Sequence, residues 1–236
     1  MNRDGLGSGM AIVPPPKTGA QQSAQNTKRT LIGPVNKIHT VWDIQRLYNI
    51  SCLASEIVSY WRRRRMQPDL VPKTSQVIYY PARLFETLEI PIIQHGSKVI
   101  WDIQKLRCTG YRQFRDTIPR GDWVWVQMAD SSKYGILRGH LPGKLKALFT
   151  VRLGGEDQEL ALVEMMEVEK NGRPWKFHGL VTVLEHSDEY SRSIFVVSIR
   201  SLVAMAHLVQ DREMSSRWYI NSRIDLWTFN QFGSER

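Results

Sequence analysis

The chain has 236 residues, which is room for one sizeable domain with appendages or for two small ones, and its apolar and charged fractions are ordinary for a globular protein. No apolar run approaches the roughly 20 residues of a membrane-spanning helix, and the first residues lack the apolar core of a signal peptide, so we expect an intracellular protein without a membrane partner. The net charge of +9 belongs to the first half, because residues 1–119 carry 17 Lys and Arg against 8 Asp and Glu, whereas residues 120–236 carry 15 of each.

The N-terminal third contains a low-complexity segment followed by a helical pattern. Residues 1–36 are rich in Gly, Pro, Ser, Gln and Asn without apolar periodicity, which predicts a disordered tail. From Thr40 to Met66 apolar residues recur every three or four positions, which predicts one long amphipathic helix within residues 37–66. Thr40 and Asp43 match an N-terminal capping pair.

Four consecutive arginines, Arg62, Arg63, Arg64 and Arg65, close this helical pattern. Positive charge in a last turn complements the helix dipole, so a solvated helix end is one interpretation. The alternative is a patch that contacts the phosphates of DNA or chromatin and serves nuclear import. That alternative makes the four arginines the candidate nucleic-acid contact and predicts a nuclear protein.

Residues 67–75, with two prolines, are predicted to be a linker to a β-rich domain over residues 76–233. Residues 76–80 and 98–104 are predicted to be its first strands. The segment WDIQKL at 101–106 nearly repeats WDIQRL at 42–47, but the flanking residues and the apolar periods differ. We interpret the near-repeat as coincidence.

Residues 120–153 predict three consecutive strands. Residues 122–128 alternate strictly, with Trp123 and Trp125 on one face. The sequence Leu-Pro-Gly-Lys at 141–144 predicts a type II turn, because Pro suits its second position and Gly its third. After this turn the third strand is predicted to place five apolar side chains on one face: Leu145, Ala147, Phe149, Val151 and Leu153.

Further turn signals divide the rest of the chain into short strands. Gly154-Gly155 predicts a turn, residues 158–168 predict a strand with apolar side chains on both faces, and Asn171-Gly172 predicts a hairpin. Four more strands are predicted at 175–185, 194–199, 202–209 and 218–221, with a short helix at 226–232. The predicted fold is therefore mainly β (α+β): a small SH3-like or BAH-like barrel, or a sandwich, preceded by one long amphipathic helix.

Motifs for catalysis or metal binding are missing from the sequence. It has no glycine-rich phosphate loop, nucleophile elbow, HExxH motif or EF-hand loop. Cys52 and Cys108 are too far apart for a metal clip, and the six histidines do not fall at ligand spacing. We predict no enzyme activity, no catalytic residues, no metal and no cofactor.

Aromatic side chains offer a second candidate surface. Trp123, Trp125, Tyr134 and Trp175 lie on predicted neighbouring strands and loops, and they are enough for a face that binds a protein partner as a methyl-lysine cage, or one that stacks bases. The alternative is that these rings fill the core, where each buries a large apolar area. A protein partner is also possible through the helix.

A combination of short segments resembles the C-terminal region of Plavaka-type fungal transposases. The similarity covers about residues 76–232, and the segments are YPARL (80–84), LRCTG (106–110), DWVWV (122–126), GHLPGKL (139–145) with LF (148–149), MAHLV (205–209), and NSRIDL (221–226) with TFN (228–230). In that family a DDE catalytic domain with a ribonuclease-H-like fold lies upstream of this region, and no part of the chain resembles it. The resemblance therefore implies an accessory domain without transposase activity.

Two hypotheses follow for function. The first is a non-enzymatic binding module, derived from a transposase C-terminal tail, that contacts DNA, chromatin or a protein partner. The second is an inert transposon remnant that folds without an independent activity. An exposed apolar face on residues 41–61 would mark the second, because such a face once covered by a missing domain would remain open to solvent.

Overall fold

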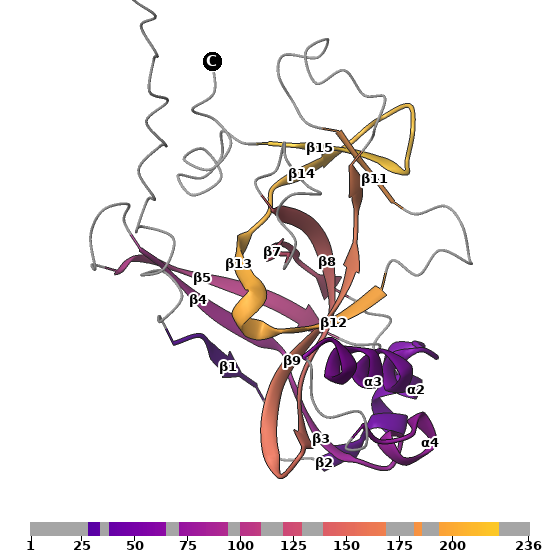
Figure 1. The fold of residues 1–236 in the computed structure, drawn as a ribbon. Helices are drawn as coiled ribbons and strands as arrows, with labels where there is room; N and C mark the ends of the chain where they lie inside the picture. The colour runs from indigo at the N-terminus through magenta and orange to yellow at the C-terminus, as the bar shows by residue number, and fades with distance from the viewer. Residues whose placement is uncertain are drawn as a thin grey trace, which may run out of the picture.

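The computed structural model describes residues 28–33, 38–64, 71–93, 100–109, 120–128, 139–168, 182–185 and 194–221 (Figure 1). Their elements in chain order are β1 (Thr30–Ile32), β2 (Ile38–Thr40), α2 (Val41–Tyr48), α3 (Leu53–Arg63), α4 (Thr74–Val77), β3 (Pro81–Phe85), β4 (Thr87–Ile93), β5 (Ile100–Thr109), β6 (Arg120–Gly121), β7 (Trp123–Gln127), β8 (His140–Leu153), β9 (Glu156–Met165), β10 (Glu167–Val168), β11 (Thr182–Leu184), β12 (Ile194–Ser198), the 3-10 helix η4 (Ile199–Ser201), β13 (Leu202–Met205), β14 (Leu208–Gln210) and β15 (Arg217–Ile220).

The long hairpin of β8 and β9 is the centre of the largest sheet. Gly154 and Gly155 join the two strands, both with positive φ, as a two-residue hairpin turn requires. Along its other edge β8 pairs first with β7 and then with β3, while β12 extends the sheet beyond β9 and β2 extends it beyond β3. The predicted turn at Gly154-Gly155 is confirmed.

The predicted turn at residues 141–144 is wrong, because β8 runs straight through it. The N–H and C=O of one strand residue point to the same side, and the carbonyl of Pro142 accepts a hydrogen bond from the N–H of Met166, just past the end of β9. Pro142, which has no backbone N–H to donate, therefore lies at the end of the β8–β9 ladder. A Cβ on Gly143 would come within 2.4 Å of Cγ1 of Val163, so glycine here allows close packing.

A β-bulge in β8 corrects a second prediction. The register shifts between Leu145 and Ala147, which pair with the consecutive residues Val163 and Leu162. One extra residue on one strand reverses which face the following side chains occupy. Leu145 therefore packs into one core, whereas Ala147 and the later odd-numbered apolar residues of β8 pack into the other.

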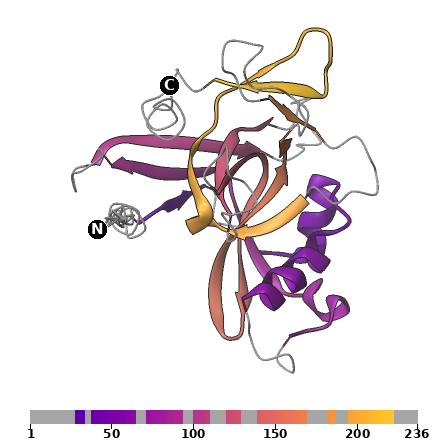
Figure 2. The ribbon, with the colours of Figure 1, turned by 45° about the horizontal axis from the view of Figure 1, so that its top comes forward.

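Both faces of the hairpin are buried, and its residues alternate between two apolar cores. In β9, Leu160 and Leu162 face the core shared with α2, α3 and α4, while Ala161 and Val163 face the core shared with β4, β5, β7, β11, β13 and β15. The helices accordingly lie on one side of the hairpin, with β4 and β5 on the other (Figure 1, Figure 2). The prediction of a strand apolar on both faces is confirmed.

Mainly β structure is confirmed, but a barrel is not. The described strands form three open antiparallel sheets, of which the two smaller have the orders β1-β4-β5-β6 and β10-β11-β15-β14. These strands do not close into a barrel, so that alternative is wrong for the described part of the chain. The predicted hairpin at Asn171-Gly172 and the predicted helix at 226–232 lie outside the described residues.

The predicted single long helix is wrong, because the chain forms α2 and α3 with a turn between them. Asn49 adopts the left-handed conformation, with φ of 52°, and ends α2. The side chain of Gln45 then accepts a hydrogen bond from the N–H of Ala54 at 2.9 Å, which fixes the turn. At the other end of α2 the predicted capping pair of Thr40 and Asp43 is confirmed.

Residues 30–32 and 76–80 differ from their predicted state. Residues 30–32, predicted to be disordered, form β1 on β4, because Leu31 packs against the core and Arg29 Nε donates to the carbonyl of Leu202 at 2.8 Å. The predicted strand at 76–80 is instead α4 and a turn, and α4 begins inside the predicted linker.

The near-repeat is helical in α2 and extended in β5, as expected of a coincidence.

The packing of the helices on the hairpin makes a prediction about stability. Ile57 of α3 is fully buried, whereas Ile38 of β2 is 65% exposed. Ile57→Ala should lower the free energy of unfolding by about 2 to 5 kcal/mol, because it opens a cavity in the core. Ile38→Ala should cost about 1 kcal/mol or less. Urea denaturation of both variants measures the difference, and equal losses would contradict a shared core of α3 and the sheet.

Candidate functional site

The described arginines at the end of α3 have three different environments. The side chain of Arg62 is exposed and forms no hydrogen bond or ion pair with a described residue. Arg63 donates from Nη2 to the carbonyl of Val196 on β12 at 2.9 Å, and its Cζ lies 5.8 Å from the ring centroid of Phe195. Arg64 caps the helix, while Arg65 lies outside the described residues.

Arg64 is held by one residue of its own helix and one of the hairpin. Its Cζ lies 5.6 Å from the ring centroid of Tyr60, one helical turn earlier. Its Nη1 donates to the side-chain oxygen of Gln158 at 3.3 Å. Two of the three described guanidinium groups are therefore fixed against the sheet.

The last turn of α3 packs against the β8–β9 hairpin turn. Trp61 is buried, and its ring carbon Cζ2 would lie 3.6 Å from a Cβ on Gly154, an ordinary contact distance. The last turn of α3 thus lies beside the β8–β9 turn and beside β12, the edge strand of the sheet. Because Trp61 is buried here, Arg63 and Arg64 lie next to the hairpin and the edge strand β12.

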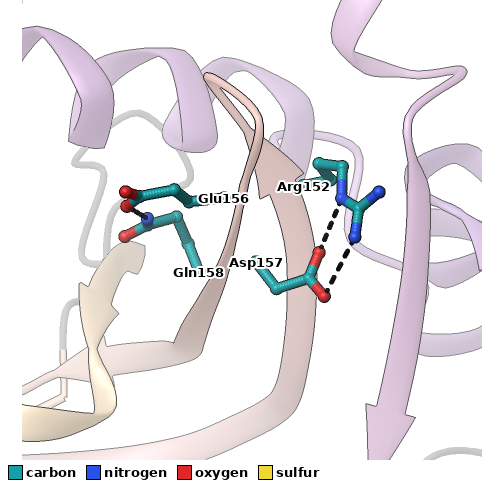
Figure 3. A network of polar contacts seen from close by, with 4 residues as sticks. All are labelled: Arg152, Glu156, Asp157 and Gln158. Carbon is teal, nitrogen blue, oxygen red and sulfur yellow. Dashed lines mark hydrogen bonds and ion pairs between the residues drawn. The ribbon is translucent and has the colours of Figure 1, made fainter.

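Positive charge at the end of α3 has no carboxylate partner among the described residues. A carbonyl, an amide oxygen and two aromatic rings contact Arg63 and Arg64, and none of the three described arginines forms an ion pair with a described carboxylate. The nearby acids have other partners, since Asp157 pairs with Arg152 at 3.0 Å and Glu156 accepts from Gln158 at 3.4 Å (Figure 3). The helix dipole also favours cations here.

Sequence reasoning found the arginines but missed the groups that hold them. Val196 and Phe195 are separated from Arg63 by more than a hundred residues, so no local pattern links them. The spacing of four residues between Tyr60 and Arg64 on a helix is the local signal that could have found one contact.

The structure describes two of the four residues of the predicted aromatic face, Trp123 and Trp125. Trp125 is fully buried in the core, so it presents no ring to a partner, while Tyr134 and Trp175 lie outside the described residues. Trp123 is half-buried and packs on Trp218 of β15, with ring centroids 5.0 Å apart and ring planes inclined by 58°. Rings this close contact each other and leave no space between them for an ammonium group.

Trp123 nevertheless has a cation beside it, from within the chain. Lys144 of β8 places Nζ 5.6 Å from the ring centroid of Trp123, and the indole N–H of Trp218 donates to Glu185 at 2.9 Å. Both indoles are therefore engaged in contacts within the protein. This arrangement favours the core-packing interpretation of the aromatic residues.

Three further observations concern the described part of the chain. No group of three or more His, Cys, Asp or Glu side chains is placed there to hold a metal ion. Burial raises the pKa of the Cys108 thiol to about 12, which keeps it protonated at neutral pH. Among the described helices, none is long and apolar enough to span a membrane.

A scan against protein-family models, a search of curated proteins and a search of solved structures each find no match for this chain. The resemblance to the Plavaka-type transposase tail thus stays a prediction.

The burial of Cys108 makes a prediction about thiol reactivity. In the native protein at pH 8, a thiol reagent such as DTNB should modify the half-buried Cys52 and spare Cys108, because the reagent needs an accessible thiolate. Unfolding in urea should release the second thiol. The variant Cys52→Ala is the control and should show almost no native labelling; rapid labelling of this variant would contradict the burial of Cys108.

Proposed function

We propose that this chain is a non-enzymatic binding module that contacts nucleic acid, as DNA or chromatin, through the arginines at the end of α3. The observation that carries the proposal is the uncompensated charge of Arg62, Arg63 and Arg64, whose described partners are all neutral. Elsewhere on the sheets, Lys105, Lys146 and Arg152 are paired with carboxylates. A phosphate backbone would supply the anionic partner that these three arginines do not have among the described residues.

Partial immobilisation of two guanidinium groups supports the same proposal. An arginine side chain has roughly 2 kcal/mol of rotamer entropy to lose when a ligand fixes it. Contacts with Val196 and Gln158 already restrict Arg63 and Arg64, whereas Arg62 is free to adjust. Phosphate contacts would then release counterions from the nucleic acid at a reduced entropic cost, and binding would weaken as salt is added.

The inert-remnant hypothesis loses the feature that would have marked it. It expected an apolar face on residues 41–61 open to solvent, but the apolar residues Val41, Ile44, Leu53, Ile57 and Trp61 are buried against the chain's own sheet. Trp42 and Leu47 are the exposed large apolar residues of this segment. A missing catalytic domain is therefore not needed to cover α2 and α3.

Origin and location remain part of the proposal. The resemblance to the C-terminal region of Plavaka-type transposases is compatible with a module that works near DNA, and the arginine run is compatible with nuclear import. Neither argument depends on enzyme activity.

The test is binding of the purified chain to a nonspecific DNA duplex across a salt series. Changing Arg62, Arg63, Arg64 and Arg65 together to Ala should weaken binding at least tenfold and reduce the slope of log K against log salt by about 3 to 4, since each lost phosphate contact removes about 0.9 from the slope.

The control variant removes the same charge from other surfaces, by changing the exposed cations Lys73, Arg83, Arg107 and Arg212 to Ala. It should bind much as the wild type does. Equal weakening of both variants would mean that net charge alone drives binding, and salt-independent binding would contradict a phosphate contact.

A further inference from the structure

Two arginine–aromatic pairs lie side by side in the sequence at the end of α3. The guanidinium of Arg63 lies over Phe195, and that of Arg64 lies over Tyr60. Tyr60 is only 7% exposed, whereas Arg64, whose guanidinium lies over the Tyr60 ring, is exposed. Each guanidinium also has a hydrogen-bond acceptor, and the ring and the acceptor together restrict its orientation.

A guanidinium group is planar and delocalised, and it stacks on aromatic faces in a way that an ammonium group does not. The Cζ atoms of Arg63 and Arg64 lie 5.8 Å and 5.6 Å from their ring centroids, so each ring leaves part of the guanidinium surface uncovered. Unpaired nucleic-acid bases stack on arginine planes as they do on aromatic rings. Since Arg63 and Arg64 are both exposed, each can offer such a face to a base.

The base must be unpaired to reach this surface. In a duplex the bases are stacked on one another, and a protein surface without a groove-reading element meets mainly phosphates. In a single strand both the bases and the phosphates are accessible, so stacking and charge act together. Arg62 has no described partner that would hold it back from a neighbouring phosphate.

We propose that the α3 end prefers single-stranded nucleic acid to duplex, with bases stacked on the guanidinium planes of Arg63 and Arg64 and a phosphate bound by Arg62. This inference rests on the proposed function and narrows its ligand. Stacking does not depend on base identity, so little sequence preference is expected.

The experiment compares a fluorescent oligothymidylate of about 12 nucleotides with a duplex of the same length at one salt concentration. The wild-type chain should bind the single strand at least tenfold more tightly. Arg63→Lys with Arg64→Lys keeps both positive charges but removes both planes. This variant should lose most of the single-strand preference while duplex affinity and the salt slope change little.

Two control variants test whether the single-strand preference depends on stacking at the end of α3. Phe195→Leu removes the ring under Arg63 without changing charge, and it should reduce single-strand affinity without a matching loss for the duplex. Arg83→Lys with Arg107→Lys makes the same chemical change at exposed positions elsewhere and should leave the preference intact. Circular dichroism checks that every variant is folded.

The outcomes distinguish this inference from the proposed function. Equal, salt-sensitive binding of single strand and duplex would overturn the stacking inference and leave the phosphate contact standing. Unchanged preference in the double lysine variant would also overturn it. If polyglutamate competes as effectively as the oligonucleotide, the arginines recognise negative charge alone, and the stacking inference is overturned. No binding to either nucleic acid would remove the proposed function and the inference together.

Discussion

Burial of both faces of the β8–β9 hairpin is the constraint on which the rest of the structure depends. One face needs the helices and the other needs β4, β5 and the C-terminal strands, so neither half of the chain can cover the hairpin alone. The bulge between Leu145 and Ala147 divides β8 between the two cores. Apolar side chains on both faces of an antiparallel sheet therefore join segments far apart in sequence into one folded unit.

The arginines gain their arrangement from this packing. Trp61 anchors the last turn of α3 beside the hairpin turn, and Arg63 and Arg64 then contact β12 and β9. Arg63 there satisfies a carbonyl of the edge strand β12, which also blocks one position at which another strand could pair. The same contact thus protects an open edge and orients a cation toward solvent.

The sequence predicted features whose signals are local, and it missed those decided by distant contacts. The capping pair at Thr40 and the turn at Gly154-Gly155 were predictable because neighbouring residues suffice for each. The Pro142-Gly143 pair carries the signature of a turn, yet pairing on both sides keeps it extended. The break at Asn49 interrupts a continuous apolar period, and the near-identical segments in α2 and β5 demonstrate that tertiary packing overrides local preference. The arginine run is evident in the sequence, whereas the contacts of Arg63 with β12 and of Arg64 with Gln158 depend on the fold.

Native-state hydrogen exchange can establish whether α3 and the β8–β9 hairpin form one cooperative unit. We expect the slowest amides of α3 and of both strands to exchange through the same opening, with equal free energies and equal dependence on denaturant. Exchange of α3 at a clearly lower free energy, with the hairpin still protected, would contradict it. The arginines would then sit on a helix that detaches from the sheet.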